Sequence, residues 1–321
     1  MELNDLKKIA ELALEKYEIE SVAMDFLTEE TNVFFKVIDS NNNVYALKIY
    51  QEESSTLDDN QAELFLLDAV KKNSDLFVPE VFLDNSGKGI VNVQLDAGSS
   101  KKRVALFKWI EGIDFFGNET IKHFQGLGKM LAKLHMATLD IVIPKNINPK
   151  KWDKVFYYRG EKSVYKQNEF RSIISAEYIN TMDFIIPYLN ERLANFYRKD
   201  NPQLLHADLN PWNIKLHENE LRLLDYEEAL LGYPIHDFAI MLYYYRDSKQ
   251  FRYNDIKKSL FSGYSIVCTV PTFSNFDLEL LMTARRVNFL NYVLTQDGNS
   301  KKYIEINLPK VTTFMKKYFS A

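Results

Sequence analysis

The hydrophobic pattern of the chain changes from mainly strand-like to mainly helical near residues 110–114, and this change limits the folds that the chain can adopt. Before it, apolar residues alternate or run as in β-strands, at 21–28, 32–39, 44–50, 80–83, 89–93 and 103–109. After residue 117 they follow helical spacing, at 120–138, 173–198, 235–247, 276–294 and 307–319. With 321 residues the chain is long enough for two packed lobes. We therefore predict an α+β fold with an N-terminal lobe of residues 1–110 and a C-terminal lobe of residues 111–321.

The predicted N-terminal lobe is an antiparallel sheet with one helix packed on it. The polar stretch 40–43 is typical of a hairpin turn between two of the strands. The helix is expected at 57–71, with an apolar stripe at Leu64, Leu67 and Val70. A further helical pattern over residues 1–17 precedes the sheet. In the C-terminal lobe two short strands, 214–216 and 221–224, interrupt the helices.

Composition excludes several classes of protein. The net charge is −4 and the basic residues are dispersed, so nothing favours binding to a nucleic-acid backbone. No apolar run is long enough to span a bilayer, so we expect no membrane segment. A single cysteine, Cys268, excludes an internal disulfide framework and fits a reducing compartment. We predict a cytoplasmic protein.

The densest group of polar residues lies immediately before the predicted pair of C-terminal strands, and one aspartate follows that pair. His206, Asp208 and Asn213 occur within eight positions, and Asp225 follows at the end of the second strand. Phosphoryl transfer needs a carboxylate that orients the attacking hydroxyl and oxygen ligands that hold magnesium. Asp208, Asn213 and Asp225 supply these groups. The alternative for each residue taken singly is structural: Asp208 and Asn210 as turn residues, Asp225 as a strand-end cap and His206 as a core histidine.

The N-terminal lobe contributes one lysine within an apolar strand. Lys48 lies in the strand 44–50, where a buried ammonium group is costly unless it meets an anion such as a phosphate. Glu63 lies beside the apolar stripe of the next helix and is the nearest candidate partner. The alternatives are a lysine that reaches water from an edge strand and a solvated helical glutamate.

These motifs resemble those of the aminoglycoside phosphotransferase and choline kinase superfamily, which includes homoserine-kinase-like and stress-response-kinase-like members. The resemblance extends over about residues 21–290 and is carried by residues 127–135, 206–213 and 225–239. It implies a bilobal protein-kinase-like fold. It also implies ATP- and Mg²⁺-dependent transfer of the γ-phosphoryl group to a hydroxyl of a small molecule, of the amino alcohol, sugar or aminoglycoside type.

The resemblance also implies roles for individual residues. Asp208 would be the catalytic carboxylate, Asn213 and Asp225 the magnesium ligands, and His206 and Asp237 supports of the catalytic loop. On the nucleotide side, Lys48 would contact the α- and β-phosphates with Glu63 bracing it, and the backbone of Lys108, Trp109 and Ile110 would bond adenine.

One departure from the relatives is the absence of glycine before Gly87. A glycine-rich turn lets the backbone approach phosphates, but the corresponding turn here contains Glu29 and Glu30. We expect Thr31 and Asn32 to face the nucleotide and the two glutamates to face water. This departure keeps open an alternative, a nucleotide-binding pseudokinase module.

The acceptor is expected to be a small molecule. Ala207 stands where protein kinases place an arginine, and residues 226–233 are too few to present a peptide and a regulatory phosphosite. A protein Ser/Thr kinase of the bacterial stress-response type remains the alternative. Aromatic and basic residues are available for the acceptor, unless they are core tyrosines and a solvated helix face: Trp152, Tyr157, Tyr158, Trp212, Tyr243, Tyr244, Tyr245, Arg285 and Arg286.

Overall fold

The computed structural model describes residues 2–198, 201–296, 298 and 300–319. The chain folds into two compact units, which are described separately. The first comprises Met1–Asn118, Ile143–Asn148 and Trp212–Glu228, and the second comprises Glu119–Val142, Pro149–Pro211 and Ala229–Ala321.

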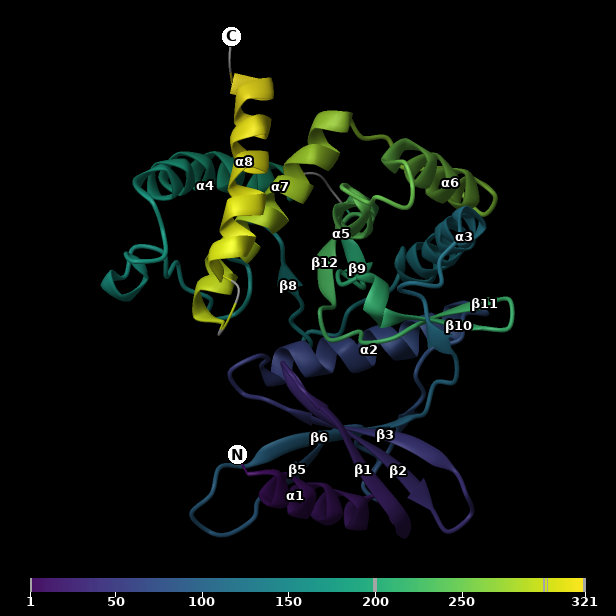
Figure 1. Ribbon diagram of the computed structural model, residues 1–321. Coiled ribbons are helices and arrows are strands. Elements are labelled where there is room, and N and C mark those ends of the chain that lie inside the picture. Colours follow the sequence, from purple (N-terminus) through teal and green to yellow (C-terminus); the bar gives the residue numbers. More distant parts are fainter. Residues whose placement is uncertain (1, 199–200, 297, 299, 320–321) are drawn as a thin grey trace. The chain divides into compact units, whose positions relative to one another are not determined.

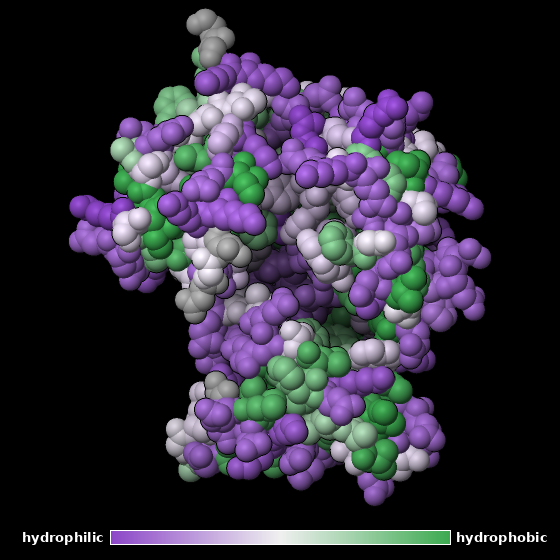
Figure 2. All heavy atoms as spheres, viewed as in Figure 1, coloured by the Kyte–Doolittle hydropathy of each residue, from purple (hydrophilic) through white to green (hydrophobic). Residues whose placement is uncertain are grey.

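The first unit is built on an antiparallel sheet in which all six expected strands occur. They are β1 (Ser21–Glu29), β2 (Asn32–Asp39), β3 (Val44–Tyr50), β4 (Val81–Phe82), β5 (Val91–Val93) and β6 (Lys102–Lys108). The order is β1-β2-β3-β6-β4, with β5 also paired to β6. β1 is therefore an edge strand, and its Val22, Phe26 and Leu27 are exposed. Figure 2 shows hydrophobic side chains on the front of this unit, where Figure 1 places β1.

Two helices cover this sheet, whereas only one was predicted to pack on it. α1 (Leu3–Lys16) and α2 (Leu57–Asn73) lie on opposite sides of it (Figure 1). Side chains alternate along β3, so Leu47 and Ile49 join the apolar cluster with α1, whereas Lys48 faces α2. The helical pattern near the N-terminus thus belongs to the core of the sheet.

The first unit also takes in a segment from far along the chain. β10 (Ile214–His217) pairs with β11 (Glu220–Leu223) and with β7 (Ile113–Asp114). Gly112 has φ +143, and a Cβ there would lie 2.8 Å from the carbonyl oxygen of Leu216, so a glycine is needed for this close approach. The compact units therefore do not follow one cut at residue 110. The assignment of nucleotide binding to residues 1–110 and catalysis to residues 111–321 stays a prediction.

The second unit is mainly helical, as expected. Its helices are α3 (Ile121–Thr138), α4 (Ala176–Phe196), α5 (Pro234–Tyr245), α6 (Tyr253–Ser265), α7 (Asn275–Tyr292) and α8 (Ser300–Phe319). A small sheet has the order β8 (Lys150–Lys151), β12 (Leu230–Gly232) and β9 (Gln203–Leu205). The 3₁₀ turns are η1 (Asn168–Phe170), η2 (Pro211–Asn213) and η3 (Val293–Thr295). The boundary between the units falls within η2, because Pro211 belongs to the second unit and the next two residues belong to the first.

Three features of the second unit were not predicted. Helix α6 contains three serines and a glycine, which are not strong helix formers, and it packs closely on α3. A Cβ at Gly128 would lie 1.9 Å from the Leu260 carbonyl oxygen, and one at Gly263 would lie 1.9 Å from that of Gln125. Helix α8 begins at Ser300 and carries Pro309 inside, although proline favours a first helical turn. The strands of two or three residues are too short to give a periodic signal.

None of the helices in the described part of the chain is both long and apolar enough to cross a membrane.

Candidate active site

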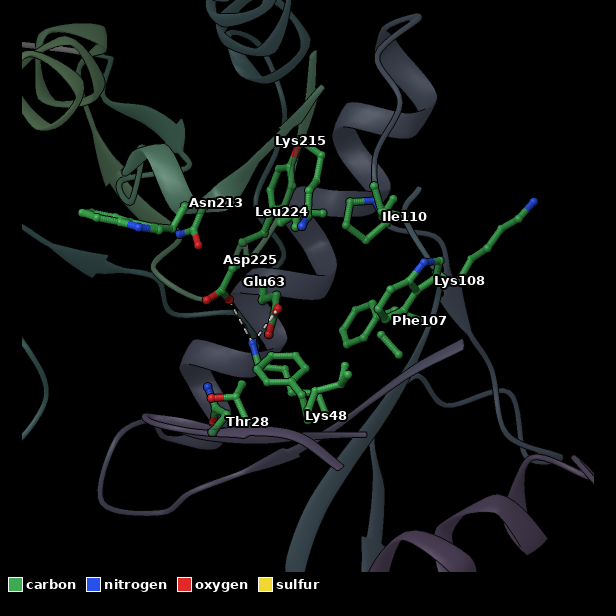
Figure 3. Close-up of a pocket in the computed structure, with 18 of the residues that line it drawn as sticks. Thr28, Lys48, Glu63, Phe107, Lys108, Ile110, Asn213, Lys215, Leu224 and Asp225 are labelled. Carbon is green, nitrogen blue, oxygen red and sulfur yellow. Dashed lines mark hydrogen bonds and ion pairs between the residues drawn. The ribbon is translucent and has the colours of Figure 1, made fainter. Parts of the chain in front are cut away.

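A cavity of about 430 Å³ lies in the first unit and collects every predicted nucleotide and metal residue of that unit. This size is typical of small-molecule sites. Figure 3 shows that its walls come from β1–β3, α2, the end of β6 and the segment around β10 and β11. The predicted residues in its lining are Thr31, Asn32, Lys48, Glu63, Lys108, Trp109, Ile110, Asn213 and Asp225.

Lys48 is the centre of this cavity's charged wall. Its side chain is 1% exposed, and Nζ lies 3.0 Å from Glu63 Oε1, 3.2 Å from Asp225 Oδ1 and 3.0 Å from Glu227 Oε2. Burial by itself lowers the pKa of Lys48, but the three carboxylates outweigh it and hold that pKa well above its ordinary value. Lys48 is therefore a fixed positive charge (Figure 3). The alternative of a lysine reaching water from an edge strand is wrong, because β3 is central in the sheet.

Glu63 is buried on α2 and is not a solvated helical residue. It also accepts a hydrogen bond of 2.8 Å from the Tyr50 hydroxyl. Burial raises the pKa of Glu63 to about 7, and the nearby carboxylates add to this while Lys48 opposes it. Three carboxylates thus share one ammonium group, and one of them holds a proton more readily than an ordinary glutamate.

Glu227 is a site residue that the sequence analysis missed. It is 5% exposed, Asn32 Nδ2 donates to its Oε2, and its Oε1 has no hydrogen-bond partner among the described residues. A sequence signal was available, because Glu227 is a second acidic residue only two positions after Asp225.

Asn213 lies just before β10, and Asp225 lies just after its partner strand β11. The Leu224 amide donates to the Asn213 carbonyl oxygen at 2.8 Å, so the two segments run side by side into the cavity. Asp225 has φ +52, a left-handed conformation that aspartate tolerates better than most residues, and its side chain is 32% exposed.

The donor set of this cavity fits a divalent cation. No group of three or more His, Cys, Asp or Glu side chains in the described residues forms a ready metal cage. Magnesium is usually held by one or two carboxylates together with phosphate oxygens and water. Glu227 Oε1 is buried without a hydrogen-bond partner in the described part of the chain, and three carboxylates surround the single ammonium group of Lys48. A cation would balance the negative charge that remains.

The glycine-free turn brings Thr31 and Asn32 to the cavity, and Glu30, which was expected only to face water, lines it as well. Thr31 lines it and is exposed. Asn32 is 1% exposed, and its side chain is engaged by Glu227 and by the Gln51 amide, which donates to Oδ1 at 3.2 Å. Glu30 is exposed, as expected, but it also lines the cavity. The turn therefore places a carboxylate at the edge of the site.

The linker after β6 has fewer free backbone donors than the sequence analysis assumed. The Lys108 amide donates to the Glu80 carbonyl at 2.8 Å, and the Trp109 amide donates to that of Val44 at 3.1 Å. A backbone donor for a base must therefore come from Ile110 or beyond. The side chain of Lys108 extends away from the other labelled residues (Figure 3).

In the second unit Asp208 lies in the loop after β9 and is held at both oxygens. Arg285 Nη2 donates to Oδ1 at 2.9 Å, and Asn210 Nδ2 donates to Oδ2 at 2.9 Å. The side chain is 16% exposed. His206 is fully buried, and its Nδ1 accepts the Asp208 amide at 3.1 Å.

Asp237 supports the same loop from α5. Its Oδ1 accepts the amide of Ala207, which has φ +61, and its Oδ2 lies 3.0 Å from His135 Nε2. Burial alone would raise the pKa of Asp237, but hydrogen bonding and charge from His135, with His206 adding to them, hold it below its ordinary value. An ionised Asp237 thus fixes a strained position just before Asp208.

The predicted acceptor residues are distributed over different places. Tyr157 and Tyr244 gather around Arg285, which is 5% exposed, so the alternative of a solvated helix face is wrong for this arginine. Arg286 is also buried, and its Nε donates to Asn307.

Trp212 belongs to the first unit, where it packs on Phe116 at 4.7 Å between ring centroids. Trp152 is fully buried, and Tyr245 bonds Glu119.

Solved structures share the fold over nearly the whole chain. An aminopropanol kinase associated with a microcompartment is 18% identical, with 98% of each chain covered and a TM-score of 0.75. An amicoumacin kinase is 14% identical, covering 99% of this chain and 94% of that one, with a TM-score of 0.76. The choline kinase of Streptococcus pneumoniae is 17% identical, covering 98% and 100%, with a TM-score of 0.59. At these identities the likeness confirms the predicted protein-kinase-like fold.

No curated protein matches the chain in sequence. The sequence pattern that describes the phosphotransferase enzyme family matches residues 27–264, a span that includes the charged wall of the cavity and the Asp208 loop. The chain belongs to the phosphotransferase enzyme family.

Proposed function

We propose that the chain uses ATP and magnesium to phosphorylate a hydroxyl group of a small molecule. The observation that carries this proposal is the buried ammonium group of Lys48, held between Glu63 and Asp225 on the wall of a cavity of about 430 Å³. A fully buried, permanently charged lysine beside an open cavity is suited to an anion such as a nucleotide phosphate.

The nucleotide side of the proposal divides the cavity into an apolar and a charged part. Ala46, Phe107 and Leu224 line it with apolar atoms suited to a base, near Ile110. Lys48 contacts phosphates, and Glu63 fixes its position. Solved relatives carry AMP-PNP with Ca²⁺ in one case and ADP in another, which supports a nucleotide site.

Asn213 and Asp225 would hold the magnesium ion, and Glu227 would add negative charge close by. When bound, the ion neutralises charge that develops on the phosphates. The chain's own residues bind and align: Lys48 binds the phosphates, while Asp208 accepts a hydrogen bond from the acceptor hydroxyl and orients it.

A small acceptor is supported by the short connection after Asp225. Residues 226–233 contain β12 and lead directly into α5, which leaves no long segment for binding a peptide. The similar structures include kinases of aminopropanol, choline and spectinomycin, all small molecules. We further propose a cytoplasmic location, since the lone Cys268 needs no oxidising compartment.

A screen of amino alcohols, sugars and aminoglycosides for acceptor-dependent ADP release tests the proposal. Release with one of these classes, dependent on magnesium, is the expected outcome. Thermal stabilisation by Mg·ATP without transfer to any acceptor would instead favour the pseudokinase module. Phosphate incorporated into the protein or into peptides, but not into small molecules, would favour a protein kinase.

Asp208→Ala tests the proposed catalytic carboxylate. We expect turnover to fall by roughly 10²- to 10⁴-fold, because the acceptor hydroxyl loses its orienting group, while the affinity for Mg·ATP is retained. Asp183→Ala, which removes an aspartate from the exposed side of α4 in the same unit, is the matched control. Full turnover in Asp208→Ala would remove this residue from the mechanism.

A further inference from the structure

Arg285 is a buried charged residue of the second unit that the proposed mechanism does not yet use. Its guanidinium group lies 4.9 Å from the centroid of the Phe289 ring. Nη2 donates to Asp208 Oδ1 and, at 3.3 Å, to the Tyr244 hydroxyl, and Nη1 lies 3.5 Å from the Tyr157 hydroxyl. Its Nε has no hydrogen-bond partner among the described residues. Burying a guanidinium group this deeply is costly, and Asp208 is the carboxylate that offsets the cost.

The helix that carries Arg285 fixes its surroundings. Arg285, Asn288 and Asn291 are spaced three apart on α7 and so share a face. Asn288 Nδ2 donates to the Val155 carbonyl at 3.0 Å, and Asn291 Oδ1 accepts the Val164 amide at 2.8 Å. The segment that contains Tyr157 is therefore fastened to the same face of α7 as the arginine.

The tyrosines complete a rigid enclosure. The Tyr157 and Tyr158 rings stack with centroids 4.4 Å apart, and the Tyr157 hydroxyl donates to that of Tyr158 at 3.1 Å. Burial lowers the pKa of Arg285, but the phenol groups of Tyr244, Tyr158 and Tyr157, together with Asp208, raise it well above its ordinary value. Arg285 therefore stays charged and has little freedom to move.

This enclosure determines how Asp208 can present its oxygens. A carboxylate offers about four lone-pair positions, and here Arg285 and Asn210 each take one, on different oxygens. Rotation of the carboxylate would break both bonds at once. The Asp208 side chain is 16% exposed, so a hydroxyl group can reach it.

We infer that Arg285 is a positioning residue for phosphoryl transfer: it locks the Asp208 carboxylate in the orientation that receives the acceptor hydroxyl. This inference rests on the proposed function. Arg285 would then differ from a residue that binds the acceptor directly, because Arg285 acts on the reaction through Asp208. Removing it should therefore change turnover more than nucleotide binding.

Three substitutions separate the contributions of charge and geometry. Arg285→Gln keeps a short donor but removes the charge, and we expect kcat to fall by about 10- to 100-fold because the carboxylate is no longer fixed. The KM for ATP should stay within about twofold, since this change removes a transition-state interaction. Arg285→Lys should have a higher kcat than Arg285→Gln, because an ammonium group keeps the charge although it lacks the planar, two-pronged geometry of the guanidinium group. Arg285→Met should have a kcat no higher than that of Arg285→Gln. A KM effect with unchanged kcat would overturn the inference.

A double-mutant cycle tests the link to Asp208 without any need for turnover. Urea unfolding is measured for Arg285→Gln, Asp208→Asn and the double variant, and the two effects should be clearly non-additive. Arg286→Gln is the matched control, because it removes the adjacent buried arginine of α7, whose bond goes to Asn307; its effect should add to that of Asp208→Asn. If the wild type is active and the effects of Arg285→Gln and Asp208→Asn on stability add, the inference about Arg285 is overturned while the proposed function stands. A wild type that phosphorylates no acceptor would overturn the proposed function and the catalytic role of Arg285 with it.

Discussion

Each unit buries one cation against a carboxylate, but the two centres are balanced differently. In the first unit, Lys48 lies within 3.2 Å of Glu63, Asp225 and Glu227. In the second unit, Arg285 meets one carboxylate, Asp208, together with tyrosine hydroxyls. The first centre has an excess of negative charge, and the second is close to neutral.

This difference separates two kinds of site. An excess of carboxylates around a lysine favours the binding of a further cation. When phosphates bind, Lys48 can exchange a contact with a carboxylate for a contact with a phosphate. A neutral pair enclosed by aromatic groups has no such excess and mainly fixes geometry. The first centre is thus suited to binding charge, and the second to orientation.

The largest expected effect concerns the two aspartates themselves. Asp225→Ala should weaken magnesium-dependent ADP binding by at least about a hundredfold, since it removes a proposed ligand. Asp208→Ala should leave that binding nearly unchanged. Calorimetric titration of ADP at several magnesium concentrations makes the comparison. Equal losses of ADP affinity in the two variants would mean that the centre around Lys48 is no more important for binding charge than the centre around Arg285.

Lys48→Met should be the most damaging of the changes at the first centre for stability. It leaves buried carboxylates without their cation, and we expect a loss of about 3–5 kcal/mol in the free energy of unfolding. The matched control is Lys71→Met, which breaks an exposed pair with Glu80 on the same unit and should cost less than about 1 kcal/mol. Chemical denaturation of both variants provides the measurement, and similar costs would contradict the picture of a buried cluster.

The two units should also differ in their response to acid. Burial lowers the pKa of His236 in the second unit to about 4, so between pH 6.5 and 4 the unfolded chain binds a proton that the folded chain does not. Stability should therefore fall by about 3 kcal/mol as the pH drops through this window. Glu63 in the first unit acts in the opposite direction. Its raised pKa means that the folded chain binds the extra proton, so its contribution is present below pH 4.5 and is lost as the pH rises to about 7.

Denaturant midpoints from pH 4 to 8 measure these two slopes. His236→Asn keeps an acceptor for the Tyr233 amide and should flatten the loss of stability in acid, whereas Glu63→Gln should steepen it. The same pH slope in His236→Asn as in the wild type would exclude His236 as the source.

The smallest expected effect comes from Glu227→Gln. The change keeps the shape of the side chain and removes one of three negative charges, so stability should change by less than about 1 kcal/mol. Magnesium affinity in the presence of ADP should fall by about tenfold, as is typical for groups near a metal. Glu220→Gln, at the exposed first residue of β11, is the control. An unchanged magnesium affinity would show that the excess charge has no part in binding the cation.

Much of the first unit and of its site was predictable, because strands and single charged residues leave local signals. Lys48 stood out as one charge among apolar neighbours, and Glu63 lay beside a helical stripe, and these two do pair. Glu227 was missed although it is an acidic residue only two positions after Asp225. The engagement of Asn32 by Glu227 was not predictable, since it depends on two segments 195 positions apart.

The sequence by itself determined the strand and helix pattern, the polar loop around Asp208 and the kind of chemistry that its residues allow, because these depend on local spacing and residue type. Tertiary structure decided which charges meet. The pairing of Arg285 with Asp208, the packing of α6 on α3 at Gly128 and Gly263, and the attachment of residues 212–228 to the first unit all join distant segments. Such contacts have energies that depend on burial and exact separation, and neither quantity is written in the local pattern of residues.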